Sequence, residues 1–270
     1  MHYPRALQPI SILMYHQVDA VAARGSPLRG LTVSPTAFAR QMGLLKALGY
    51  RGLSMVELAP YLRGERQGKV VGLSFDDGYL NNLEHALPVL QRYGFSATCY
   101  AVSNALGGSN HWDHAKGMAP KALMNAQQMR AWIAAGQDIG AHSCDHVDLG
   151  TLPDAAAEQQ IALCKLQLEA ALDAPVRHFC YPYGHYKDQH VAMVRAAGYA
   201  TATTTRRGRC AVPLAAVGPQ PTAAQLDANG QGASTALFEL PRVPVWRATS
   251  LAALWLKLAT GYEDRKASRP

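Results

Sequence analysis

The sequence is poor in charge and contains no long apolar run. Charged residues make up 17% of its 270 residues and hydrophobic residues 49%, so the chain can bury a substantial core and is not disordered by composition. No stretch reaches the roughly 18 consecutive apolar residues of a membrane-spanning helix, so no membrane span is expected. The 26 basic residues exceed the 19 acidic ones but form no basic stripe, so nucleic-acid binding is not expected.

The 5 cysteines are odd in number, widely spaced and free of any CxxC pair. The chain also lacks an Asn-x-Ser/Thr sequon, and its first residues carry no apolar segment behind basic residues, as a secretory signal would. Together these absences predict a reduced, cytoplasmic protein with free thiols. No motif specifies an oligomeric state.

Short apolar runs alternate with amphipathic segments along most of the chain. The predicted strands are 10–15, 70–75, 96–102, 138–141, 178–181, 200–204 and 240–245. Several are apolar at every position, as strands covered on both faces are. Strands that alternate with helices predict parallel β/α units, closed into a barrel or open as a doubly wound sheet. No composition shift marks a boundary, so residues 1–270 are expected to form one domain.

Several helices are predicted from their ends and their apolar stripes. Ser34 before Pro35 predicts a helix that begins there and stops at Gly49. Asn125 and Gln128 have the spacing of a capping box. Further helices are predicted around 161–172 and 193–197.

Two segments near the carboxyl terminus differ from the rest. Residues 206–236 are rich in Pro, Gly, Ala and Gln, which predicts a long surface loop or a lid. An amphipathic helix is expected at about 250–260, with apolar side chains at 251, 254, 255 and 258 on one side. This segment and the residues after it contain four cations, Lys257, Arg265, Lys266 and Arg269. It is therefore a candidate for peripheral contact with an anionic membrane.

Three polar clusters come directly after predicted strands, where β/α folds carry their active sites. Residues 74–78 read SFDDG, residues 142–146 read HSCDH, and residues 179–184 read FCYPYG. The adjacent carboxylates of Asp76 and Asp77 are costly to hold together unless a cation or a shared proton relieves them. The imidazoles of His142 and His146, four residues apart, suit one metal ion.

Each cluster also has a simpler interpretation when it is taken alone. Asp-Asp-Gly is a common turn, a His pair is often structural or exposed, and Tyr-Pro-Tyr-Gly is an ordinary turn. The clusters are more specific together. One Asp and two His can form a facial triad that leaves coordination positions of the metal open for water and substrate. The second Asp is then left as a base.

In this order and context, the chain resembles the polysaccharide deacetylase family, also called carbohydrate esterase family 4 or the NodB-homology domain. The resemblance covers about 10–245 and rests on the SFDDG, HSxxH and YPYG motifs. It implies a distorted (β/α)7 barrel. It also implies that Asp77, His142 and His146 bind a divalent metal, that Asp76 is the general base, and that the backbone N–H of Tyr183 stabilises the oxyanion.

The sequence departs from the common family pattern in two places. The third motif often has Arg where this chain has Cys180, and the late motif that supplies the general acid has no convincing match. A subgroup similar to poly-β-1,6-N-acetylglucosamine deacetylases takes the acid from an early Tyr-His motif. Residues 13–19, LMYHQVD, match that motif, which makes His16 the expected acid, with a buried structural histidine as the alternative.

Three further residues are weaker candidates for substrate contacts. Trp112 follows the third strand as a sugar-stacking platform or as a packed loop residue. Tyr181 belongs to the third motif. Arg242, in the last strand, is expected to contact substrate or to support Asp76, with a surface salt bridge as the alternative.

The resemblance implies a hydrolase that removes an N-acetyl group from an N-acetylated sugar or glycan. Zinc is the first expected metal, and one carboxylate with two imidazoles would also accept Co²⁺, Ni²⁺ or Fe²⁺. One alternative is a deformylase or deacetylase of a lipid-linked or nucleotide-linked sugar, which a cytoplasmic location favours. Another is a non-catalytic glycan-binding domain, which would not need Asp76.

Overall fold

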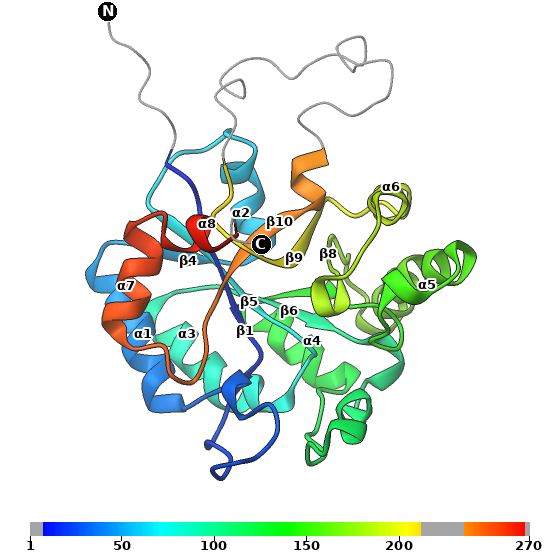
Figure 1. Cartoon of the computed structure of the whole chain (residues 1–270), viewed down its shortest axis with the longest axis horizontal. Coiled ribbons are helices and arrows are strands. Elements are labelled where there is room, and N and C mark those ends of the chain that lie inside the picture. Colours follow the sequence, from blue (N-terminus) through cyan, green and yellow to red (C-terminus); the bar gives the residue numbers. More distant parts are fainter. Residues whose placement is uncertain (1–7, 212–234, 268–270) are drawn as a thin grey trace, which may run out of the picture.

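A computed structural model describes residues 8–211 and 235–267, and it shows a parallel β-barrel wrapped by helices (Figure 1). The strands are β1 (Ile12–Tyr15), β2 (Gln17–Val18), β3 (Thr32–Val33), β4 (Arg51–Leu53), β5 (Val70–Phe75), β6 (Thr98–Ala101), β7 (Asp138–Ala141), β8 (His178–Cys180), β9 (Thr201–Arg207) and β10 (Leu240–Pro244). The helices are α1 (Pro35–Ala47), α2 (Met55–Leu62), α3 (Leu87–Tyr93), α4 (Ala126–Ala134), α5 (Asp154–Leu172), α6 (Asp188–Ala196), α7 (Leu251–Ala259) and α8 (Tyr262–Ala267). None of these helices combines the length and apolar character needed to cross a bilayer.

Seven parallel strands close the barrel in the order β1-β10-β9-β8-β7-β6-β5, and β5 pairs back onto β1. The closure is irregular at β5. Its first half, Val70–Gly72, pairs with β4, and its second half, Ser74–Phe75, pairs with β6 on the same side. The distorted seven-stranded barrel expected from the resemblance is therefore confirmed, and the open-sheet alternative is wrong.

The side chains of the barrel alternate between two packed regions. Leu13 and Phe75 belong to the large cluster that fills the space between the barrel and its helices. Ile12, Tyr100 and Cys180 belong to a smaller cluster. Because successive residues of a strand point to opposite faces, neighbours such as Ile12 and Leu13 fall into different clusters. This accounts for strands that are apolar at every position.

The predicted strands all correspond to strands of the closed barrel, and the helix ends predicted from capping residues are confirmed. Ser34 caps α1, with its hydroxyl accepting a hydrogen bond from the backbone N–H of Ala37 at 3.2 Å. Asn125 and Gln128 form the predicted capping box of α4. The sequence did not predict β4, α2 or α3. In α2, Pro60 interrupts the helical pattern, and α3 begins with Leu87-Pro88 after a π-helical turn.

The carboxyl-terminal segment corrects two expectations. Arg206 and Arg207 lie in β9 rather than in a loop, and residues 212–234 of the loop or lid predicted at 206–236 lie outside the described residues. In α7, Leu254 and Leu258 are buried, whereas Leu251 and Trp255 are exposed, so the predicted apolar side is split between two faces.

Lys257 and Arg269 cannot be counted among the exposed cations of this segment. Lys257 is buried, and its ammonium donates to the carboxylate of Glu263, so it is unavailable for a membrane contact. Arg269 lies outside the described residues.

Candidate active site

The three sequence clusters meet at one end of the barrel, because the carboxyl ends of parallel strands share an edge. Asp76 and Asp77 follow β5, His142 follows β7, and Tyr181 follows β8. A pocket of about 150 Å³ opens there. Its lining consists of His16, Leu28, Leu31, Asp76, Asp77, Trp112, Asp113, Lys116, His142, His146, Tyr181, Tyr183 and Thr205. All six predicted catalytic and metal-binding residues lie in this lining.

Asp77, His142 and His146 place three ligand atoms around one point. The Oδ1 atom of Asp77 lies 3.5 Å from Nε2 of His142 and 3.2 Å from Nε2 of His146. All three side chains are buried, and their ligand atoms lie within 4.8 Å of one another. One carboxylate oxygen and two imidazole nitrogens are a donor set that suits a divalent transition-metal ion.

The second nitrogen of each imidazole has its own partner, which orients the ring. Nδ1 of His142 lies 2.8 Å from the carbonyl oxygen of Cys180, so this nitrogen carries the proton and Nε2 keeps a free lone pair. Nδ1 of His146 lies 3.1 Å from the hydroxyl of Tyr183. Both Nε2 atoms are therefore turned toward Asp77, and the residues fit a bound metal ion.

Asp76 has a different environment from its neighbour. Arg242 in β10 donates from Nη1 to Oδ1 at 2.6 Å and from Nη2 to Oδ2 at 2.7 Å. The same guanidinium also donates to the hydroxyl of Ser74 and to the carbonyl of Thr204. A bidentate pair of this kind fixes the plane of the carboxylate. Arg242 is fully buried, so it acts on Asp76, and the alternative of a surface salt bridge is wrong.

Both carboxylates are held in the ionised form. Burial alone would raise the pKa of Asp76, but the Arg242 guanidinium outweighs burial and holds that pKa below its ordinary value. Burial also opposes ionisation of Asp77, and the adjacent imidazoles of His142 and His146 hold its pKa well below the ordinary range. The repulsion expected between two adjacent anions is thus relieved by separate partners.

Unfavourable backbone conformations are concentrated at this pocket. Six non-glycine residues of the described chain have positive φ. Four of them, Leu28, Asp77, His146 and Tyr183, line the pocket. Each such residue costs about 1–3 kcal/mol unless the surrounding structure imposes it, and such residues gather at functional sites. These conformations could not be predicted from the sequence, because no glycine marks the four positions.

His16 lies at the rim of the pocket, where the early Tyr-His motif predicted it. Its Nε2 is 4.0 Å from Oδ2 of Asp76, and 18% of its side chain is exposed. Its carbonyl oxygen accepts a hydrogen bond from the amide of Asn82 at 2.8 Å, which anchors the backbone. The imidazole is therefore close to the proposed base and open to the pocket, unlike a fully buried structural histidine.

Comparisons with known proteins agree with this geometry. A family model described as Polysaccharide deacetylase matches residues 63–202, just over half of the chain. The chain belongs to the polysaccharide deacetylase family. Asp76, Asp77, His142, His146 and Tyr183 all fall within the matched residues, whereas His16 and Arg242 lie outside them.

Individual polysaccharide deacetylases resemble the chain at low identity. YxkH of Bacillus subtilis is 27% identical over 201 residues, covering 74% of this chain and 65% of that protein. The poly-β-1,6-N-acetyl-D-glucosamine N-deacetylase of Staphylococcus epidermidis is 22% identical over 175 residues, covering 63% of this chain and 60% of that protein. The chain thus spans less than two thirds of either relative. The deacetylase PplD of Streptococcus pyogenes, solved with acetate, shares the fold, with a TM-score of 0.73, 24% identity, and coverage of 93% of this chain and 99% of PplD.

The departure from the family pattern at Cys180 has a structural counterpart in this chain. Cys180 is buried where the third motif often has Arg, and its sulfur lies 3.2 Å from Nη2 of Arg242. The guanidinium that holds Asp76 therefore comes from β10, which is separated from β8 by β9 alone. No spacing within the third motif could have indicated this exchange.

Two of the three weaker candidates for substrate contacts, Trp112 and Tyr181, line the pocket. Trp112 stacks on the ring of His146, with centroids 4.5 Å apart and planes at 16°, so one of its faces is already covered. Tyr181 is fully buried, and its hydroxyl donates to the carbonyl of Phe238 at 3.1 Å. The prediction of Arg242 as a substrate contact is wrong, because both of its terminal nitrogens are bonded to Asp76. Leu28, Leu31 and Lys116 line the pocket and were not predicted.

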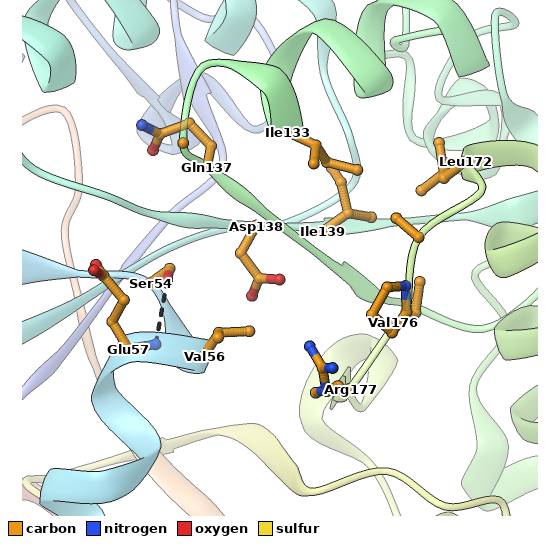
Figure 2. A pocket seen from close by; sticks show the side chains of 13 residues that line it. Ser54, Val56, Glu57, Ile133, Gln137, Asp138, Ile139, Leu172, Val176 and Arg177 are labelled. Carbon is orange, nitrogen blue, oxygen red and sulfur yellow. Dashed lines mark hydrogen bonds between the residues drawn. The ribbon is translucent and has the colours of Figure 1, made fainter.

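A second and larger pocket lies at the opposite, amino end of the strands (Figure 2). It has a volume of about 310 Å³, and it is lined by the residues that precede or begin α2, β7 and β8. Figure 2 shows Asp138 and Arg177 pointing into the same space, with Glu57 farther away. No pair of imidazoles is present in its lining.

Proposed function

We propose that this protein is a metal-dependent N-deacetylase that hydrolyses the acetamide group of an N-acetylated sugar residue, giving acetate and a free amino sugar. The observation that carries the proposal is the separation of roles between two adjacent carboxylates. Asp77 meets two imidazoles, whereas Asp76 is held by Arg242 beside them. A metal site alone does not need Asp76, but hydrolysis needs a general base next to the metal.

Asp77, His142 and His146 are the proposed ligands, and zinc is the first choice of metal. When bound, a divalent cation polarises the acyl carbonyl and lowers the pKa of the attacking water. The buried, oriented imidazoles of this chain fit that cation better than Mg²⁺ or Ca²⁺, which prefer ligand sets made of oxygen atoms.

The other residues of the pocket account for the proton transfers. Asp76 takes a proton from the attacking water as the water oxygen bonds to the acyl carbon. The backbone N–H of Tyr183 donates a hydrogen bond to the acyl oxygen as negative charge develops on it. His16 gives a proton to the amine nitrogen as the C–N bond breaks, because an unprotonated amine is a poor leaving group. The acyl carbon leaves as acetate.

Release of acetate from defined substrates tests this proposal. The Staphylococcus epidermidis relative is named for poly-β-1,6-N-acetyl-D-glucosamine, so oligomers of that glycan are the first substrates to try. We expect acetate release by the wild type with added Zn²⁺ or Co²⁺. Asp76→Asn should keep the metal but lose activity by roughly 10²- to 10⁴-fold, the usual effect of losing a general base.

The same assay separates the remaining alternatives. N-formylated and lipid-linked amino sugars test for a deformylase or for a deacetylase of a lipid-linked substrate. Binding of a glycan by the wild type without release of acetate or formate, whichever metal is added, would contradict the proposal and favour a non-catalytic glycan-binding domain.

A further inference from the structure

Helix α7 has an exposed face that consists only of apolar residues. Figure 1 shows the helix at the outer edge of the molecule, beside α1. Its exposed positions follow one helical face, and we call this the outer face: Leu251, Ala252, Trp255, Leu256 and Ala259. The opposite face packs on the core through Leu254 and Leu258 and also carries the buried Lys257. A helix with apolar side chains on both its inner and its outer face is normally covered on both.

Trp246 extends the outer face beyond the helix. It lies in the loop between β10 and α7, and 38% of it is exposed, compared with 48% of Trp255. Two exposed tryptophans beside two exposed leucines form a larger apolar surface than an isolated exposed side chain, and such surfaces usually contact a partner. Trp is also the side chain best suited to the boundary between water and an apolar phase.

The exposed charges at the border of the outer face include three cations. Arg247, Arg265 and Lys266 are all exposed. The two nearby acids are already engaged. Glu263 is buried and accepts from Arg207 and Lys257, and Asp264 accepts from Arg209.

The neighbouring helix α1 extends the same charge pattern. It contains no acidic residue, and its exposed charged residues are Arg40 and Lys46, of which Lys46 donates to the carbonyl of Tyr93 in α3. The outer face is thus an apolar strip with exposed cations at its border.

We propose that the outer face of α7, with Trp246, docks onto an anionic lipid bilayer. Apolar and tryptophan side chains enter the headgroup region, and the bordering cations attract acidic headgroups, as in other peripheral amphipathic helices. A second copy of the chain fits this surface less well. A two-fold interface would bring the same cations of both copies together, and their repulsion would oppose it.

The outer face is connected to the rim of the candidate active site. The backbone N–H of Arg247 donates to the carbonyl of Gly30 at 2.9 Å, and Leu28 and Leu31, beside Gly30, line the active-site pocket. Docking would therefore bring the pocket close to the lipid surface, where a membrane-linked or membrane-adjacent glycan is present. This inference concerns location and does not depend on the proposed deacetylation.

Co-sedimentation with lipid vesicles tests the proposal directly. We expect the wild type to bind vesicles of phosphatidylcholine containing phosphatidylglycerol, to bind pure phosphatidylcholine much more weakly, and to dissociate in high salt. The double variant Trp255→Gln/Leu256→Gln should lower the partition constant roughly tenfold to hundredfold, because two buried apolar contacts are lost. Arg247→Gln/Lys266→Gln should weaken binding and reduce its dependence on salt.

The chain offers a matched control on another helix. Leu163 and Leu166 are exposed on α5, a helix that also carries Asp154, Glu158 and Glu169. Leu163→Gln/Leu166→Gln removes two exposed apolar side chains away from the cations and should leave vesicle binding unchanged. All variants should keep the wild-type melting temperature, because the altered side chains are exposed.

Three results would overturn the proposal. One is the absence of vesicle binding by the wild type, and another is equal loss of binding in the α5 control and the α7 variant. The third is a wild-type dimer in sedimentation velocity that Trp255→Gln/Leu256→Gln dissociates, which would assign the outer face to a second copy of the chain.

Discussion

The two ends of the barrel hold pockets that share residue types but differ in chemistry. At the carboxyl end, Asp76 and Asp77 are each matched by cationic or imidazole partners, and their pKa values are lowered. At the amino end, burial raises the pKa of Asp138 to about 7, although Arg177 opposes this rise. Asp138 accepts a hydrogen bond from the hydroxyl of Thr98 at 2.6 Å, so its surroundings suit a structural role.

Pocket size does not indicate which end is functional. The amino-end pocket is about twice as large, yet the carboxyl-end pocket has the convergent donors, the strained residues and the facing carboxylates. In parallel barrels the loops after the strands carry chemistry, whereas the opposite end serves stability. The comparison therefore predicts that substitutions at the carboxyl end change activity and that substitutions at the amino end change stability alone.

The largest effect is expected from the proposed metal ligands. Replacing Asp77, His142 or His146 by Ala should abolish tight metal binding and, with it, activity, because each supplies one of three protein ligands. Metal content after dialysis, measured by mass spectrometry, checks this. One metal ion per chain in all three variants would place the metal elsewhere.

His16→Ala should keep the metal and the fold but lose amide hydrolysis by roughly 10²- to 10⁴-fold, the scale of general-acid catalysis. The hydrolysis of an activated aryl acetate should be much less affected, because a phenolate leaves without being protonated. Rates on both substrates, together with the melting temperature, separate an acid from a structural histidine. Equal losses on amide and ester would return His16 to a structural role.

Arg242→Lys tests whether the bidentate pair positions Asp76. Lys keeps the charge but cannot hold both carboxylate oxygens, so we expect kcat to fall roughly tenfold to hundredfold while KM and metal content change little. Arg242→Met would leave Asp76 buried without a partner and should lower the free energy of unfolding by about 3–5 kcal/mol. An unchanged kcat in Arg242→Lys would show that the orientation of Asp76 does not limit turnover.

The smallest effect on turnover is expected at the amino end. Asp138→Asn should leave kcat unchanged. In the wild type the folded chain keeps the Asp138 proton up to a pKa of about 7, whereas the unfolded chain releases it near its ordinary value. Stability should therefore fall as pH rises from about 4 to about 7, and this part of the pH dependence should be absent in Asp138→Asn. Urea titrations at several pH values measure this pH dependence of stability. A loss of turnover in Asp138→Asn would contradict the distinction between the two ends.

The elements that the sequence could predict are those that depend on local patterns. Strand runs such as 70–75, the helix caps at Ser34 and Asn125, and the clusters at strand ends are all contained within a few residues. Their meeting at one pocket follows from the parallel arrangement, which places the ends of all strands at one edge.

The elements that the sequence could not predict depend on register and closure. The sequence offers support of Asp76 as one of several roles for Arg242 but does not decide between them, because the two residues are 166 positions apart and only the pairing of β10 with β1 brings them together. The burial of Lys257 likewise depends on Glu263 in α8, and the left-handed backbone at Leu28 has no glycine to signal it. A single apolar side at 251, 254, 255 and 258 does not indicate the outer face of α7, to which Ala252, Leu256 and Ala259 also belong.

The position of Arg242 near the end of the chain determines when the candidate active site is completed during synthesis. The proposed ligands are complete once residue 146 has been made, whereas the guanidinium that neutralises Asp76 emerges about a hundred residues later. A nascent or truncated chain that ends before β10 would contain all three proposed metal ligands. It would lack the cationic partner of Asp76, whose burial would then be uncompensated. It would also lack the strand that joins β9 to β1 in the barrel. Hydrolytic competence would thus appear only with the last strand, so that unfinished chains are inert.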